Sequence, residues 1–422
     1  MSLLSGKQVR KVFGHFSPFQ ESGELKPETE RVSILAANAQ VPLDVMSRAF
    51  TTAASDGSGS PLLVQMSFTA LKAAGGGDPA SGAALARAIL EAHAEQSGAR
   101  LVGMTLDHFR VPAFPARARG VGAAAPREGG DGRQRRLDER LARARIDDAA
   151  AAASGLPGCA VDRETVEQYI GYMTSAQYAE FKRSFLEAVR CGKPAWGMID
   201  TERLPPVLDF AVTRDVIDAV RQCPGNDDIV LEAEFGATGS SGDAIPYVRL
   251  VGRELEEFAR SVAAFVAYTG ADAIAYPIGM EHAARRGETH EPDIERLVAV
   301  HREVARATGR YVPFAQHGGT GAARLARGLV GKNNVATKFV VVAANYLADY
   351  VRANEGDIRA GVKSACGARM FDGMVRALVE VTIGKLKECG SYGRAPELTF
   401  VLAEEARAPS YKGTGDSEEG VE

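Results

Sequence analysis

The sequence predicts an α/β fold, a parallel (β/α)8 barrel of the TIM type, with an insertion after the third strand and a C-terminal helical extension. Eight short apolar runs alternate with stretches of helical periodicity, the pattern of strands that are buried between helices. Three of the seven histidines stand where such runs end. Because the carboxyl ends of barrel strands meet at one face, we expect these side chains to share one site.

The candidate strands are short apolar segments bounded by turn residues. In chain order they cover residues 32–38, 61–67, 101–107, 195–200, 229–234, 273–278, 312–317 and 334–340. Amphipathic periodicity predicts helices over 81–96, 212–223, 252–270 and 292–309. A closing helix over 370–391 could carry part of a subunit interface.

Residues 111–165 do not follow this repeat. They are rich in Ala, Arg and Gly and poor in large apolar residues, so they cannot bury much core. We interpret them as a partly disordered insertion with a helix over 133–153, either a solvated surface or a binding arm. The polar, acidic tail 406–422 is expected to be disordered, which leaves residues 1–405 as one barrel domain.

The composition indicates a cytoplasmic enzyme. The formal net charge of −4 gives no electrostatic reason for a nucleic-acid or membrane partner. No apolar run of about 18 residues occurs, and the first residues lack the apolar core of a signal peptide. Five unpatterned cysteines favour a reducing compartment over a disulfide framework.

Three strand ends carry histidines, namely His108, His282 and His317, and a fourth ends in Glu234. One such histidine would more often be structural, but imidazoles and a carboxylate that converge from separate strands suit a catalytic divalent ion such as zinc. Asp107 precedes His108, and a turn of the backbone at the strand end would let both side chains reach the site. His108 would then bind the metal while Asp107 donates or accepts a proton.

Further polar residues lie at other strand ends and in one loop. The segment HGGTG, which precedes a helical pattern near Ala322, could cradle an anion with its backbone N–H groups, or it could be an ordinary tight turn. The polar residues at strand ends are Asn38, Ser67, Asp200 and Asn334, and the loop residues are Gly318, Gly319, Thr320 and Gly321.

At these positions the chain resembles the class II (zinc-dependent) fructose-bisphosphate aldolase family, from about residue 30 to 391 apart from the 111–165 insertion. The resemblance rests on the order of six segments, each of which is weak alone. They are residues 37–67, TLDHF (105–109), GMIDTERLP (197–205), EAEFGATG (232–239), GMEH (279–282) and HGGTG (317–321).

The resemblance implies that one catalytic Zn²⁺ is held by His108, His282 and His317. Glu234 and Asp200 would bind it in an alternative position, or would hold a second divalent or monovalent cation. It also implies Asp107 as the general acid. The implied contacts to the substrate or its phosphate are Asn38, Ser67, Asn334, Thr337 and the 318–321 loop.

The implied function is that of an aldolase, a lyase of carbohydrate metabolism such as glycolysis. It would make or cleave a C–C bond of a ketose phosphate through an enediolate that zinc stabilises. The implied partners are a phosphorylated or phosphonate ketose or ketone, an aldehyde, and further copies of the chain in a homodimer or larger homo-oligomer.

Several positions depart from the family pattern. The loop 240–246 offers only Asp243 where the family has glutamates, one of which is the proton-abstracting base. Ala283 replaces a glycine, and Ala336 and Lys338 stand where aspartates are usual. We therefore expect a substrate other than fructose 1,6-bisphosphate. The alternatives are another metal-dependent barrel enzyme, an isomerase or hydrolase, and a non-catalytic aldolase-like subunit.

Overall fold

The computed structural model describes residues 3–40, 42–115, 132–225, 228–236, 247–280, 290–320 and 324–403. Eight parallel strands form one sheet in the order β6-β5-β4-β3-β2-β1-β8-β7. They are β1 (Ile34–Asn38), β2 (Leu62–Ser67), β3 (Val102–Arg110), β4 (Trp196–Asp200), β5 (Val230–Glu234), β6 (Ala273–Ala275), β7 (Ala315–Gln316) and β8 (Lys332–Val335).

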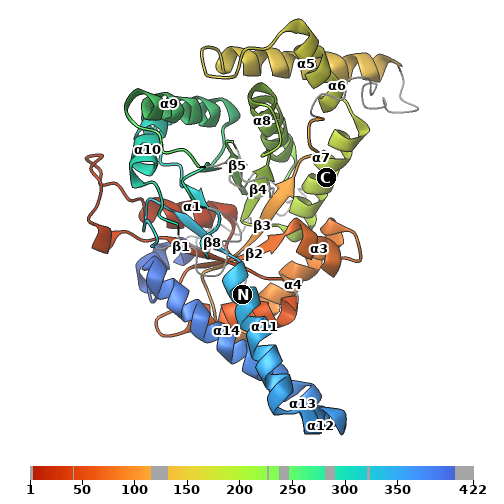
Figure 1. The fold of residues 1–422 in the computed structure, drawn as a ribbon, viewed down its shortest axis with the longest axis vertical. Coiled ribbons are helices and arrows are strands. Elements are labelled where there is room, and N and C mark those ends of the chain that lie inside the picture. Colours follow the sequence, from red (N-terminus) through yellow and green to blue (C-terminus); the bar gives the residue numbers. More distant parts are fainter. Residues whose placement is uncertain are drawn as a thin grey trace, which may run out of the picture.

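The two ends of this sheet meet between β6 and β7. A parallel bridge joins Ile274 to Phe314, and the Ile274 N–H donates to the Pro313 carbonyl at 3.1 Å. The result is a nearly closed barrel with helices around it, as Figure 1 shows. The predicted (β/α)8 barrel is confirmed.

Helices follow the strands in the alternating order that the sequence predicts. None of the described helices is long and apolar enough to cross a membrane. The α-helices are α1 (Gly6–His15), α2 (Leu43–Ser55), α3 (Phe68–Ala74), α4 (Pro79–Ser97), α5 (Gly132–Ala152), α6 (Arg163–Met173), α7 (Ala176–Gly192), α8 (Pro206–Gln222), α9 (Gly252–Thr269), α10 (Ile294–Thr308), α11 (Thr337–Ala353), α12 (Glu355–Arg359), α13 (Lys363–Cys366), α14 (Ala368–Cys389) and α15 (Thr399–Ala403). Short 3₁₀ helices cover Glu28–Glu30 and Ala395–Leu398.

Successive strand residues serve two different cores. In β1, Leu35 and Ala37 belong to the large apolar cluster between the sheet and the helices. Ile34 and Ala36 belong to a smaller cluster together with residues of α1. Both faces of each strand are therefore buried, which is why the strands read as continuous apolar runs.

Helix α1 belongs to this smaller cluster, which also contains the first residues of several strands. Its side chains Val9, Val12 and Phe13 are buried there with Trp196 of β4, and the Phe13 and Trp196 rings lie 5.0 Å apart. An apolar layer thus fills the amino end of the barrel. The polar strand ends collect at the opposite, carboxyl end, where barrels of this class place their sites.

Two local predictions were wrong. The eighth strand was expected over 334–340, but β8 ends at Val335 and helix α11 begins at Thr337. The β-branched run after Ala336 favours a strand by propensity, yet it forms the first turns of a helix that packs Phe339 into the core. The helix expected to start near Ala322 is also not found in the described residues that follow, since 324–331 contain bends, a short turn and an isolated bridge between Arg327 and Val330.

The insertion after β3 contains described structure. Helices α5 and α6 lie within it or at its end (Figure 1), and α5 confirms the helix predicted over 133–153 to within one residue. Residues 116–131 and the tail 406–422 lie outside the described residues. The division into one domain, insertion and tail stays a prediction.

Candidate metal centre

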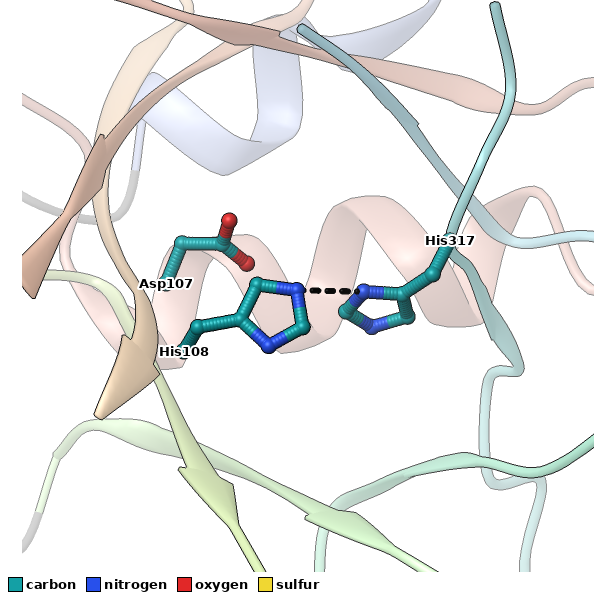
Figure 2. A group of neighbouring side chains, drawn as sticks. All are labelled: Asp107, His108 and His317. Atoms are coloured by element: carbon teal, nitrogen blue, oxygen red, sulfur yellow. Dashed lines mark hydrogen bonds between the residues drawn. The ribbon is translucent and has the colours of Figure 1, made fainter. Parts of the chain in front are cut away.

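A bulge at the end of β3 turns two neighbouring side chains toward one site. The pairing register with β4 shifts between Leu106 and Phe109, and His108 has a φ of 46°, which is rare for a residue with a side chain. In a regular strand Asp107 and His108 would point to opposite faces. Figure 2 shows both on the same side, as the sequence predicted from their place at a strand end.

The His108 ring meets the ring of His317, which follows β7. Nε2 of His108 and Nδ1 of His317 lie 3.0 Å apart, and the two ring centroids are 4.7 Å apart (Figure 2). With the carboxylate of Asp107, these residues offer three ligand atoms that all lie within 4.8 Å of one another. Two imidazoles and a carboxylate are a donor set that suits zinc or a similar divalent ion.

In each imidazole, the nitrogen that does not face the other ring lies within hydrogen-bonding distance of a carboxylate. Nδ1 of His108 lies 3.0 Å from Oδ2 of Asp200, and Nε2 of His317 lies 2.9 Å from Oε1 of Glu232. An ionised carboxylate can only accept, so both of these nitrogens carry protons. The nitrogens left to bind a cation are the two that face each other. Histidine ligands of metal sites are typically backed by carboxylates in this way.

The charges around His108 keep it protonated when no cation is bound. Its burial alone would lower the pKa of the imidazole, but Asp107, Asp200 and Glu232 raise it to about 9. For Asp200, burial raises the pKa of the carboxyl, yet His108 and Arg110 hold it well below its usual value. The proton of His108 occupies the gap between the two rings, where a divalent ion would replace it. The residues present therefore fit such an ion.

The predicted metal ligands do not all join this group. His282 lies outside the described residues. Asp200 bonds to His108 Nδ1 and to the guanidinium of Arg110, whose Nε lies 3.0 Å from Asp200 Oδ2. It therefore orients the candidate ligand His108 and is not itself one of the clustered ligands. Glu234 is fully buried at the end of β5 and is not among the three clustered residues. The roles of His282, Asp200 and Glu234 as ligands stay predictions.

A cavity of about 190 Å³ opens beside the histidine pair. It contains all the predicted substrate-binding residues that the structure describes; Gly321 lies outside the described residues. The lining is Asn38, Gln40, Gln65, Ser67, Asp107, His108, His317, Gly318, Gly319, Thr320, Asn334, Ala336 and Thr337.

This cavity is rich in hydrogen-bond acceptors. Asn38 Oδ1, Gln65 Oε1, Asp107 Oδ1 and Asn334 Oδ1 are all buried and have no hydrogen-bond partner among the described residues. Buried acceptors of this kind are costly unless a donor meets them. A ligand with several hydroxyl groups, together with a cation, would supply the missing partners.

One of the backbone donors that the sequence predicted in the glycine loop is not available to an anion, and the role of the rest of the loop stays a prediction. The Gly319 N–H donates to the Asn334 carbonyl at 3.2 Å, so it is already used within the protein. The positive helix end near the cavity is that of α11, because Ala336 and Thr337 line the cavity. Thr320 joins the loop to this helix by accepting the Lys338 N–H at 3.3 Å.

Several residues of the site or its support were not singled out from the sequence, namely Gln40, Gln65, Arg110, Trp196, Glu232 and Lys332. Strand periodicity could have found two of them. Gln65 lies two residues before Ser67, and Glu232 lies two residues before Glu234, so each faces the same side as a residue that was chosen. Lys332 and Trp196 carry no such signal, because their roles depend on partners in other strands.

The fold and the clustered side chains define an α/β barrel with a candidate cation site at the carboxyl ends of its strands. The family model "Fructose-bisphosphate aldolase class-II" matches residues 183–394, which is half of the chain. The chain therefore belongs to the class-II fructose-bisphosphate aldolase family, and family and fold together support an aldolase-type function.

Two solved structures are similar in fold. One is a fructose-bisphosphate aldolase from Campylobacter jejuni, with a TM-score of 0.59, 13% identity, and 93% of this chain and 96% of that chain covered. The other is the YdjI aldolase from Escherichia coli K12, with a TM-score of 0.52, 13% identity, and 93% and 99% covered. A sequence search of curated proteins finds no match. At these identities the likeness concerns the fold.

Proposed function

We propose that this protein is a divalent-ion-dependent aldolase that makes or cleaves a C–C bond of a ketose phosphate. The observation that carries the proposal is the pair of facing imidazole nitrogens, 3.0 Å apart, whose other nitrogens rest on buried carboxylates. His108 and His317 would hold the ion, with Asp107 beside them and His282 as the third predicted histidine ligand. When bound, the ion supplies Lewis acidity that makes the C–H next to a ketone acidic.

The residues around the cavity have separate tasks in this proposal. Asn38, Gln65 and Asn334 would accept hydroxyl protons of the donor substrate, because their buried oxygens need donors. Asp107 would protonate the aldehyde oxygen during condensation and take the proton back during cleavage. Its Oδ2 lies 3.4 Å from the Asn38 amide nitrogen, which keeps its other oxygen, Oδ1, available to substrate.

The phosphate end would lie near the start of α11. Thr320 and Thr337 bring hydroxyl groups to the cavity wall, and the N-terminal end of this 17-residue helix adds partial positive charge. The family's usual aspartate is replaced by Ala336, which lines the same wall. This less negative wall supports a phosphorylated or phosphonate donor that differs from fructose 1,6-bisphosphate. A cytoplasmic location and a homodimer stay part of the proposal.

The test is a cleavage assay on a panel of ketose phosphates, including fructose 1,6-bisphosphate, with and without a chelator. We expect chelator-sensitive cleavage of at least one phosphorylated ketose and poorer turnover of fructose 1,6-bisphosphate. Family-typical efficiency on fructose 1,6-bisphosphate would contradict the inference from Ala336. Activity that a chelator leaves intact, or no cleavage of any member of the panel, would reject the aldolase proposal in favour of another barrel enzyme or a non-catalytic subunit.

A matched pair of histidine variants tests the ion site itself. His317→Ala should lose divalent-ion binding and activity together. His93→Ala is the control, since His93 lies in α4 and bonds to Asp44 at 2.8 Å, outside the cavity lining. Equal ion content in the two purified variants would remove His317 from the site.

A further inference from the structure

A fully buried ion pair lies beside the candidate ion site. Lys332 at the start of β8 and Glu232 in β5 are both inaccessible to solvent, and Nζ lies 2.8 Å from Oε2. The indole Nε1–H of Trp196 donates to the same oxygen at 2.6 Å. Burial of two charges costs about as much as their attraction returns, so stability alone does not explain such a pair.

The two oxygens of Glu232 have different partners. Oε2 accepts from both Lys332 and Trp196, while Oε1 accepts from His317 Nε2 at 2.9 Å. The Lys332 ammonium also lies 5.0 Å from the centre of the Trp196 ring. Two donors, from β4 and β8, thus fix the position of the Glu232 carboxylate through Oε2. Its other oxygen, Oε1, contacts His317.

This arrangement decides which nitrogen of His317 can bind a cation. Because Oε1 can only accept, a neutral His317 carries its proton on Nε2, and Nδ1 keeps its lone pair. The Asn334 amide nitrogen also lies 3.4 Å from Nε2, but the contact with the carboxylate is shorter, at 2.9 Å, and sets the position of the proton. Nδ1 is the nitrogen that faces His108 Nε2 at 3.0 Å. The alternative tautomer would turn an N–H toward the ion and would leave the buried carboxylate without its third donor.

We infer that Glu232, held by Lys332 and Trp196, is a positioning residue that fixes the tautomer and ring orientation of His317, so that Nδ1 is presented to a divalent ion. The inference rests on the ion site of the proposed function. The surroundings of Glu232 differ from those of Asp200, the carboxylate that bonds to His108, because Asp200 is held by an Arg110 side chain that is 35% exposed. Glu232, Lys332 and Trp196 are all inaccessible to solvent, so the position of the proton between Glu232 and His317 is set by the protein alone.

Glu232→Gln separates this role from simple packing, because glutamine has nearly the same shape. Lys332 and Trp196 both need an acceptor, so the new amide oxygen would turn toward them and the NH₂ group would turn toward His317. That group donates, so Nε2 of His317 would become the acceptor and its proton would move to Nδ1. Nε2 of His108, which faces Nδ1 at 3.0 Å, would then lose its own proton and accept this one. The variant should therefore hold the tautomer that cannot bind the ion.

Two measurements on the full-length chain follow. Nitrogen-15 NMR of the histidine rings, taken without any divalent ion, should show the His317 proton on Nε2 in the unchanged protein and on Nδ1 in Glu232→Gln. Zn²⁺ affinity, measured by competition with a chromophoric chelator, should fall by about 10- to 100-fold, the usual effect of losing such a partner. Asp209→Asn is the matched control, since this buried carboxyl in α8 bonds to Thr213 and should leave the His317 tautomer unchanged.

The outcomes are distinct. A proton that stays on Nε2 in Glu232→Gln, with unchanged Zn²⁺ affinity, would overturn the inference while the ion site stands. If the unchanged protein binds no divalent ion, the proposed function fails, but the NMR comparison still decides the role of Glu232. Should Glu232→Gln not fold, Trp196→Phe removes one donor and keeps an aromatic ring. It should weaken Zn²⁺ binding by less than about tenfold, and an unchanged affinity there would count against the inference.

Discussion

Divalent-ion affinity should rise steeply with pH between 6.5 and 8.5. With no ion bound, the pKa of His108 is about 9, so the ion must displace a proton to reach Nε2. Below that pKa, each pH unit should change the apparent association constant about tenfold, which is close to 1.4 kcal/mol. Two pH units therefore correspond to about 100-fold, or about 2.7 kcal/mol.

The same pKa gives the fold without an ion the opposite pH dependence. Folding raises the pKa of His108 from 6.5 to about 9, so this group stabilises the fold fully below pH 6.5. The contribution is lost as the pH rises through 9. The difference of about 2.5 pH units is worth about 3 kcal/mol. Chelator-treated protein should thus become less stable over the range in which ion binding becomes stronger.

Chelator competition at pH 6.5, 7.5 and 8.5, with the chelator calibrated at each pH, measures the slope. Asp200→Asn is the informative companion, because the lost carboxylate is one of the charges that raise the pKa of His108. In that variant the rise of affinity should level off at a lower pH. A wild-type affinity that stays constant from pH 6.5 to 8.5 would show that His108 is not protonated, and that the reasoning from its buried acidic neighbours is wrong.

Three further outcomes are expected from single substitutions. Asp107→Asn should keep the fold and the ion but lower turnover by about two or more orders of magnitude, the scale of one general acid, and loss of the ion in dialysis would instead make Asp107 a ligand. Phe210→Ala should lower the free energy of unfolding by about 3–5 kcal/mol, because this buried ring packs edge-on against Phe265 at 4.9 Å; a loss below 1 kcal/mol in denaturant titration would contradict that. Gly82→Ala should also destabilise the protein, since the new Cβ would lie 1.9 Å from the Leu71 carbonyl oxygen, and an unchanged melting temperature would show that the helices α3 and α4 adjust freely.

Much of the barrel could be predicted from local patterns. Strands buried on both faces are apolar at every position, as in ILAAN of β1, and the amphipathic stretches between them are long enough to identify as helices. The strand ends then followed, and with them Asp107, His108 and His317. The backbone turn at His108 was also foreseeable, because two functional neighbours in one strand can share a site only if the strand is irregular there.

The wrong bounds of the eighth strand have one physical cause, which is that they depend on contacts with residues far away in the chain. β8 begins at Lys332, and a charged residue argues against a buried strand until its partner Glu232 in β5 is known. The following Val-rich run has the propensity of a strand, but contacts of Phe339 with Phe50 and the core make it a helix. These contacts could not be predicted from the local sequence, because they join segments that are far apart in the chain.

The same cause explains why the residues behind the ligands were missed. A ligand is visible in sequence because its residue type and its place at a strand end both point to chemistry. The role of a residue such as Glu232 can be recognised only from its contacts. Its two oxygens accept hydrogen bonds from Trp196 in β4, Lys332 in β8 and His317, which follows β7. Since a metal site depends on these partners for the tautomer and direction of its histidines, the ligand set alone leaves the chemistry half specified. The arrangement of Glu232, Lys332 and Trp196 is the part of this site for which the folded chain was needed.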